Sequence, residues 1–311
     1  MQRREFLRIL AFGGAAALAG PARLRAAEAP GEAKPALRFG AIADVQYADA
    51  ETKGKRFYRE SLAKLREAVA RLNELKPDFV IHLGDLIDNG FESFDAVLPI
   101  YDKLAMPHYH VLGNHDFSVD AASKGRVLAK LGLDKLGGGR GWYDFARTGW
   151  RFIVLSGADL STYAHAPGTP QRLASDRMLA DLKARGARNA QEYGGGVGPE
   201  QLAWLREALA KADAAGQRSI VFGHYPVHPP AAHNLWNDAD VLRVLESSKG
   251  LAAYICGHNH DGGYAAKGAA HFLNLKGMVD TPDTAYALVE AAPDALRVTG
   301  FGREPSRVMK L

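Results

Sequence analysis

The chain has 311 residues, 47% of them hydrophobic and 24% charged, and this ordinary composition predicts a folded protein with one large domain. Its net charge of +4 arises within residues 1–27, which contain five arginines and one acid; 34 basic and 34 acidic residues remain of the chain's 39 and 35. That balance gives no basis for nucleic-acid binding. Cys256 is the single cysteine, which excludes an intrachain disulfide and argues against a structural zinc site built from thiolates.

The first 27 residues are typical of an export signal. Arg3-Arg4-Glu5-Phe6-Leu7-Arg8 is a twin-arginine pattern, and an apolar run and small residues near Ala26 and Ala27 follow it. The apolar run is shorter than the ~20 residues of a membrane-spanning helix, so we expect cleavage and no stable membrane anchor; the alternative is an uncleaved signal anchor. We therefore expect recognition by the twin-arginine (Tat) export machinery and a periplasmic or secreted location.

Residues 28–36 form a Pro- and Ala-rich linker, and residues 37–311 are predicted to form the domain. In the domain, apolar strands alternate with amphipathic helices. The predicted strands are 39–43, 79–83, 109–112, 220–222 and 252–256, and the predicted helices are 57–75, 94–104, 199–214 and 240–247. Pro99 predicts a bend or a late start in the second helix, whereas Pro199 followed by Glu200 marks the beginning of the third.

Two further segments complete the predicted architecture. Residues 159–198 are a long insertion with polar helical content and a triple glycine, of the kind that forms a lid or a binding loop. After residue 262, four short strand-like runs are divided by Gly, Pro and Asp, and we expect them to form a second sheet packed on the first. The expected fold class is α/β, a four-layer α-β-β-α sandwich with the functional site at one end.

A short polar motif follows each of the five predicted strands. The motifs are Asp44-Val45-Gln46, Gly84-Asp85-Leu86-Ile87-Asp88, Gly113-Asn114-His115-Asp116, Gly223-His224 and Gly257-His258-Asn259-His260. Ligands bind where parallel strands end and loops begin, so these side chains are expected to lie close together. Any one motif is common, but five in this order are specific.

The residue types in these motifs suit two metal ions, which a two-metal hydrolase holds ~3.5–4 Å apart. Asp85 is the predicted bridge because a carboxylate has two oxygens to share. Asp44, Gln46 and His260 are predicted to complete the shell of one ion, and Asn114, His224 and His258 that of the other. A mixed set of His, Asp and Asn suits Mn, Fe, Zn or Co better than Ca.

Two residues are predicted to be catalytic. His115 directly follows the predicted ligand Asn114, so it should face the substrate and act on the leaving-group oxygen. Asp88 lies three residues after Asp85 and could orient the His115 ring, although it could also simply cap the next helix. His108 and His110 are equally well explained as structural residues beside a strand.

The order of the five motifs resembles that of the calcineurin-like metallophosphoesterases, whose pattern is D-x-H, G-D-x-x-D, G-N-H-[DE], G-H and G-H-x-H. Gln46 departs from this pattern, and in this respect the chain resembles the manganese-dependent ADP-ribose/CDP-alcohol diphosphatases, which share D-x-Q. The likeness runs from about residue 37 to residue 302. It is carried by segments 43–49, 235–237, 257–264 and 274–277.

This resemblance implies hydrolysis of the phosphoanhydride bond in nucleoside diphosphate-X compounds such as ADP-ribose or CDP-alcohols, with two divalent ions, manganese foremost. The substrate partner would be a small phosphorylated molecule. Spacing alone supports only a phosphoester or phosphoanhydride, so a phosphomonoesterase or cyclic nucleotide phosphodiesterase of the same fold remains an alternative. In the relatives, an aromatic residue occurs in the Gly-rich stretch before the Glu-Gln-Leu helix, whereas Gly194-Gly195-Gly196-Val197 has only Val197 there.

Two other functions fit less well. A purple acid phosphatase would carry a Tyr ligand three residues after the bridging Asp, where this chain has Asp88. A non-catalytic binding protein would have lost metal ligands, whereas here only the first-motif His is replaced.

Overall fold

Alternating strands and helices assemble into two six-stranded sheets in the computed structural model, which describes residues 37–311. The predicted leader (1–27) and linker (28–36) lie outside the described residues. The first sheet has the order β12-β11-β10-β1-β2-β3. Its strands are β1 (Leu37–Ile42), β2 (Phe79–His82), β3 (His108–His110), β10 (Ala285–Ala291), β11 (Ala295–Gly302) and β12 (Arg307–Lys310).

The second sheet has the order β4-β5-β6-β7-β9-β8. Its strands are β4 (Tyr143–Arg147), β5 (Trp150–Val154), β6 (Arg218–Phe222), β7 (Leu251–Cys256), β8 (Gly263–Lys267) and β9 (Ala270–Asn274). In each sheet the central strands run parallel: β1 with β2 and β3 in the first, and β5 with β6, β7 and β9 in the second. The carboxyl ends of these strands therefore supply loops to a common edge.

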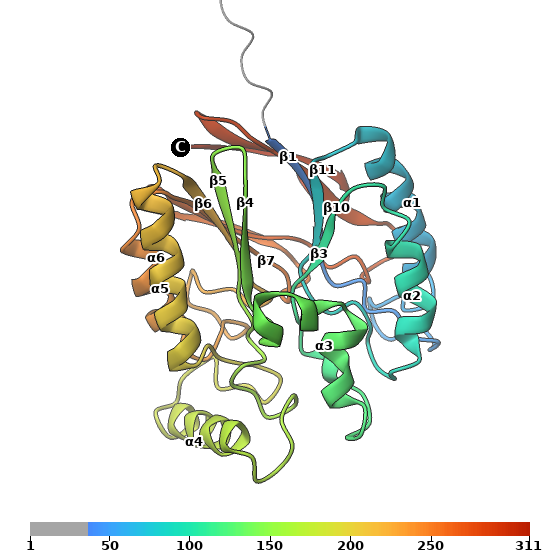
Figure 1. The fold of residues 1–311 in the computed structure, drawn as a ribbon. Coiled ribbons are helices and arrows are strands. Elements are labelled where there is room, and N and C mark those ends of the chain that lie inside the picture. Colours follow the sequence, from blue (N-terminus) through green and yellow to red (C-terminus); the bar gives the residue numbers. More distant parts are fainter. Residues whose placement is uncertain (1–36) are drawn as a thin grey trace, which may run out of the picture. The chain divides into compact units, whose positions relative to one another are not determined.

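Helices cover the outer faces of both sheets (Figure 1). The helices are α1 (Ser61–Leu75), α2 (Ser93–Tyr101), α3 (Val127–Lys130), α4 (Pro170–Ala184), α5 (Pro199–Ala214) and α6 (Asp238–Glu246), with short 3₁₀ turns at His115–Phe117, Lys124–Arg126, Leu133–Lys135 and Gly137–Gly139. Helices α1 and α2 lie on one side of the paired sheets and α5 and α6 on the other. This arrangement confirms the predicted four-layer α-β-β-α sandwich.

Aromatic side chains join the two sheets. Phe39 and Phe79 of the first sheet stack with ring centroids 5.1 Å apart, and Phe79 meets Phe152 of the second sheet edge-on at 4.8 Å. Phe222, also in the second sheet, packs edge-on against Phe39 at 5.6 Å. All four side chains are fully buried. Such pairs contribute about 0.5–1.5 kcal/mol each beyond the area they bury, so this cluster fixes one sheet against the other.

The predicted strands after residue 262 do not form a sheet of their own. Strands β8 and β9 extend the second sheet, whereas β10, β11 and β12 extend the first through antiparallel pairing of β10 with β1. The burial of β1 explains why β10 joins the first sheet. Strand β1 is almost wholly buried, and β2 occupies only one of its two edges. Its other edge needs backbone partners, and the buried strand β10 supplies them.

Local boundaries also differ from the prediction. Helix α1 begins at Ser61 and not at residue 57, because the preceding residues are held by another loop, with the Phe57 N–H donated to the Val279 carbonyl at 2.9 Å. Pro99 lies within α2, which begins at Ser93, before the predicted start at residue 94 and not after it. Strands β4, β5 and β12 were not predicted. Across the described residues, none of the helices has both the length and the apolar character that a membrane crossing requires.

Candidate metal centre

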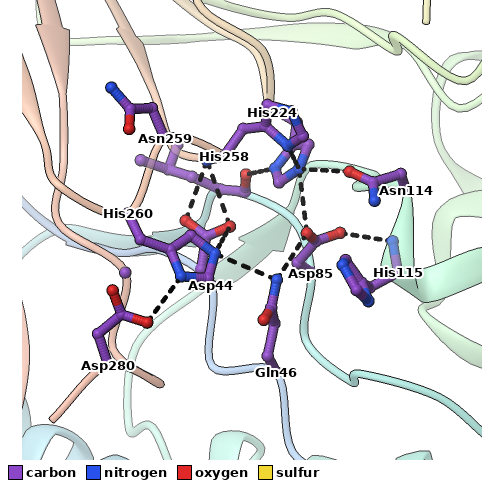
Figure 2. A network of polar contacts seen from close by, with 12 residues as sticks. Asp44, Gln46, Asp85, Asn114, His115, His224, His258, Asn259, His260 and Asp280 are labelled. Atoms are coloured by element: carbon purple, nitrogen blue, oxygen red, sulfur yellow. Dashed lines mark hydrogen bonds and ion pairs between the residues drawn. The ribbon is translucent and has the colours of Figure 1, made fainter. Parts of the chain in front are cut away.

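The loops after five parallel strands bring the predicted site residues into one cluster. Asp44 follows β1, Asp85 follows β2 and Asn114 follows β3 in the first sheet, whereas His224 follows β6 and His258 follows β7 in the second. The cluster therefore forms where the edges of both sheets meet. Figure 2 shows the side chains pointing toward one another across this edge.

The backbone at the cluster is held in an uncommon conformation. Positive φ angles of 52°, 41°, 59° and 70° occur at Asp44, Gln46, Asp85 and His258. Left-handed backbone at non-glycine residues costs free energy and persists where the surroundings enforce it, which is frequent at functional sites. These four residues lie in the loops that follow β1, β2 and β7, and their side chains are directed into the cluster (Figure 2).

One group of donors surrounds His260. Its Nε2 lies 3.5 Å from Asp44 Oδ1 and 3.2 Å from Gln46 Nε2. The Gln46 amide also reaches Asp85 Oδ2 at 3.1 Å, while its Oε1 is buried without a partner. A half-turn of the amide places Oε1 between Asp85 and His260, where it can act as a metal ligand.

A second group surrounds His224. Its Nε2 lies 3.2 Å from Asp85 Oδ2, 3.2 Å from Asn114 Oδ1 and 3.1 Å from His258 Nδ1. The other ring nitrogen, Nδ1, donates to the Leu83 carbonyl at 2.8 Å, which leaves Nε2 as the lone-pair side. Asp85 is thus adjacent to both groups, the position expected of a bridging ligand.

The cluster fits divalent metal ions on its own chemistry. Asp44 and Asp85 are fully buried carboxylates, which need positive charge nearby. Ligand atoms of Asp85, His224 and His258 lie within 4.8 Å of one another, and the buried His258 Nε2 has no partner. Carboxylate, amide and imidazole donors together match Mn, Fe, Zn or Co. Asp44, Gln46 and His260 would hold one ion, and Asn114, His224 and His258 the other, with Asp85 between them.

The protein's own charges set the protonation of these imidazoles. Burial lowers the pKa of His224, but the carboxylates of Asp85 and Asp44 and the Leu83 carbonyl together outweigh burial and raise it to about 9. The pKa of His260 is also raised to about 9, because Asp44 and Asp280 outweigh burial. Only a neutral imidazole coordinates a metal, so binding must displace these protons, and metal affinity is expected to fall as the pH is lowered.

His115 and Asp88 lie together beside the cluster. The His115 Nδ1 is 2.9 Å from the Asp88 carbonyl and 3.2 Å from its carboxylate, and the His115 backbone N–H donates to Asp85 Oδ1 at 2.7 Å. Burial lowers the pKa of His115, but the carboxylates of Asp85 and Asp88 outweigh it and raise the pKa. The contact with Asp88 has the geometry predicted for an orienting group, and the catalytic roles stay predictions.

Two carboxylates near the metal ligands were not predicted as site residues. Asp116 is fully buried and accepts the backbone N–H groups of Asp85 (3.2 Å), Leu86 (2.8 Å) and Gly113 (2.9 Å), which ties two ligand loops together. It is the last residue of a recognised motif, so the sequence carried a signal for it. Asp280 accepts from His260 Nδ1 at 2.9 Å and has no motif around it.

A pocket of about 480 Å³ opens beside the donors. Besides the metal-cluster residues and His115, the pocket is lined by Arg56, Ser118, Tyr163, Glu192, Tyr193 and His233. Tyr193 is 39% exposed, and its ring stacks on His233 with centroids 5.8 Å apart. Val197 is buried in the core beside α5 and does not line this pocket, whereas Tyr193, which directly precedes the Gly-rich stretch, does line it. His108 and His110 lie in β3, outside the pocket.

Comparison with known proteins places this fold and metal cluster in a family. The model of the calcineurin-like phosphoesterase family matches residues 37–262, and the chain belongs to that family. The protein is accordingly a metal-dependent phosphoester hydrolase.

Its relatives include a more specific group. The chain is 30% identical to the manganese-dependent ADP-ribose/CDP-alcohol diphosphatase of Mus musculus, over 89% of this chain and 94% of that protein. It is 32% identical to the protein of the same name from Danio rerio, over 86% and 96%. A crystal structure of a dimetal phosphatase from Danio rerio is similar with a TM-score of 0.81 and 29% identity, covering 89% of this chain and 99% of that one.

Proposed function

We propose that the protein hydrolyses the phosphoanhydride bond of nucleoside diphosphate-X compounds, such as ADP-ribose or CDP-alcohols, with two manganese ions as the preferred cofactor. The names of the relatives support this substrate class. Water would attack one phosphorus, the bridging P–O bond would break, and the products would be a nucleoside monophosphate and a phosphorylated X group.

The observation that carries the proposal is the composition of the pocket beside the donors. A simple phosphomonoester needs only the metal cluster. This pocket adds a guanidinium, Arg56, and an exposed aromatic ring, Tyr193, within about 480 Å³. A second phosphate suits the guanidinium, and a planar base suits the ring, because base–aromatic stacking contributes about 1–3 kcal/mol. Together these groups favour a diphosphate joined to a nucleoside.

Bound divalent ions would supply polarisation of the phosphoryl oxygens and a lowered pKa of water. The chain's own residues would do the rest. Asp88 holds one proton on His115 Nδ1, and the carboxylates of Asp85 and Asp88 raise the pKa of the ring, so the protonated imidazolium would carry a second proton on Nε2 to donate to the leaving-group oxygen. Arg56, 3.9 Å from Asp88 at its nearest guanidinium nitrogen, would bind the phosphate that departs.

Product analysis of the purified, Mn-loaded protein tests this function. We expect AMP and ribose 5-phosphate from ADP-ribose, and CMP and phosphocholine from CDP-choline. Asp85→Asn is the control for contaminating phosphatases, since loss of the bridge should abolish turnover. A higher kcat/KM for a phosphomonoester or a cyclic nucleotide would refute the substrate class and favour the alternative activities within the same family.

We also propose that the protein acts in the periplasm or outside the cell after Tat export. The support is the twin-arginine pattern at Arg3 and Arg4, which lies outside the described residues. Replacing both arginines with lysine should leave uncleaved protein in the cytoplasm, as judged by cell fractionation and immunoblotting. Continued appearance of the processed protein in the periplasm would contradict this route.

A further inference from the structure

His260 lies between two sets of partners, one on each ring nitrogen. Its Nε2 faces Asp44 and Gln46 in the donor cluster, and its Nδ1 is 2.9 Å from Asp280 Oδ1 (Figure 2). A neutral imidazole has one N–H and one lone pair. The carboxylate of Asp280 accepts only, so it holds the proton on Nδ1 and leaves the lone pair of Nε2 directed at the cluster.

Asp280 is placed where its charge can act on His260. The side chain is 1% exposed, and its second oxygen, Oδ2, forms an ion pair with Lys55 Nζ at 3.0 Å. A buried carboxylate without such partners would be costly. Lys55 is itself half exposed and also pairs with Asp261, whose side chain is 78% exposed. Two acids therefore share one lysine, but only the buried one touches a predicted metal ligand.

The backbone on both sides of Asp280 is tied down. The Val279 N–H donates to the Asp44 carbonyl at 2.9 Å, and the Thr281 N–H donates to the Lys55 carbonyl at 2.7 Å. Lys64, a buried residue of α1, donates from Nζ to the carbonyls of Val279 (3.0 Å) and Thr281 (2.9 Å). Asp280 is thus fixed relative to the strand end that carries Asp44, and the His260 ring is held against that fixed point.

We propose that Asp280 is a positioning residue that sets the affinity of one of the two ion sites, the site of Asp44, Gln46 and His260. In this site Gln46 provides an amide oxygen where the family's D-x-H motif has a histidine, and an amide oxygen is a weaker metal ligand than an imidazole nitrogen. Its affinity therefore depends heavily on His260 and on the carboxylate behind it. The site of Asn114, His224 and His258 has its own support, the Leu83 carbonyl on His224 Nδ1, and does not contact Asp280.

Manganese binding without substrate tests this role. Mn²⁺ is titrated into the metal-free wild type and the metal-free Asp280→Asn protein. Calorimetry measures the affinity of each site, and electron paramagnetic resonance distinguishes coupled ion pairs from isolated ions. Loss of an outer partner of a ligating histidine typically weakens metal binding about 10–100-fold. We expect that loss at one site only, with the other within about twofold of the wild type, and isolated-ion spectra at Mn²⁺ concentrations where the wild type shows coupled pairs.

Asp261→Asn is the matched control, because it removes the other acid on Lys55 and leaves Asp280 in place. It should bind both ions as the wild type does. Equal weakening of both sites in Asp280→Asn, together with a lower unfolding temperature of the metal-free protein, would assign Asp280 a merely structural role and overturn the proposal. Unchanged binding at both sites would also overturn it. If Asp280→Asn is insoluble, Asp280→Ser tests the same prediction with a smaller side chain.

The inference rests on the two-ion site of the proposed function. His260→Ala in the same titration distinguishes a wrong ligand assignment from a wrong role for Asp280. If His260→Ala retains two tight sites, the ligand assignment itself is wrong. If His260→Ala loses one site and Asp280→Asn loses none, the ligand assignment stands and the role of Asp280 is refuted. Neither result depends on which phosphorylated compound is the substrate.

Discussion

At the scale of single residues, His115 offers the sharpest test of catalysis. It contacts the Asp88 carboxylate and carbonyl but is not among the predicted metal ligands. Positioned acid catalysis contributes about 10²–10⁴-fold. His115→Ala should lower kcat by that range and leave manganese content unchanged, as measured by steady-state kinetics and elemental analysis. The loss should be smaller with p-nitrophenyl esters, whose leaving group needs little protonation. A fall of less than threefold with every substrate would exclude the role.

Gln46 is the residue expected to tune substrate choice. Its amide oxygen donates more weakly than an imidazole and leaves the ion more open to phosphate oxygens, of which a diphosphate supplies more than a monoester. Gln46→His should therefore shift the ratio of kcat/KM for ADP-ribose over that for a phosphoester by about tenfold toward the phosphoester, or ~1.4 kcal/mol. Metal content must match in both proteins. An unchanged ratio would locate selectivity in the pocket wall around Tyr193 and His233.

At the scale of elements, the close approach of α1 to β1 is testable. A Cβ on Gly40 would lie 2.8 Å from Leu72 Cδ2 and 3.1 Å from Val80 Cγ2, inside the packed core. Overpacking of this kind typically costs about 1–3 kcal/mol, so Gly40→Ala should lower the free energy of unfolding by about that amount in urea titrations. Gly125→Ala is the control, because nothing lies within 4 Å of its Cβ position. Equal stability of the two variants would mean that α1 can shift to make room.

The elements also show what the sequence could and could not predict. Four of the strands that carry the motifs, β1, β2, β6 and β7, were predictable, because buried parallel strands are continuous apolar runs. The strand predicted at 109–112 is instead β3 at His108–His110, which is only partly buried. The place of β10 in the first sheet was not predictable, since its pairing with β1 joins residues about 250 positions apart and leaves no local signal in the sequence. The same limit applies to the site. Asp116 sits inside a motif and Tyr193 beside the triple glycine, whereas Asp280 meets His260 only through the fold.

At the scale of the whole molecule, the dependence of stability on pH should reflect histidines that the metal site does not use. His82 of β2 is fully buried with neither ring nitrogen bonded, and His110 of β3 is 5% exposed with Nδ1 unbonded. Their rings lie 6.0 Å apart, against Tyr101. Burial lowers the pKa of His82 well below its ordinary value, and burial with the charge of His108 lowers that of His110 to about 3.

The lowered pKa values of His82 and His110 determine the direction in which stability changes with pH. Unfolding frees both rings to bind protons below their ordinary pKa of about 6.5, so the unfolded state takes up more protons than the folded state, and stability falls as the pH drops from 6.5 toward 3. The raised pKa values of His224 and His260 act above pH 6.5, and the lowered pKa of Asp85 acts below the ordinary carboxylate value of about 4. Asp116 acts between about pH 4 and 7 with the opposite sign, because burial and the Asp85 charge raise its pKa to about 7. Between about pH 6 and 4.5 the slope therefore combines the buried neutral histidines with Asp116, and a substitution at one histidine separates the two contributions.

His82→Phe isolates this contribution. Phenylalanine keeps the ring and removes two buried polar atoms that have no partners, so the variant should be about as stable as the wild type at pH 7 or more so. It should then lose stability less steeply on acidification. Urea unfolding of the metal-free proteins at pH 7, 6, 5 and 4.5 measures both slopes without interference from metal loss. Parallel curves would show that protonation of His82 does not drive the acid transition. A shallower curve for the variant would assign part of the loss of stability in acid to His82. The strand that precedes the predicted bridging ligand Asp85 would then also determine how stable the fold is at low pH.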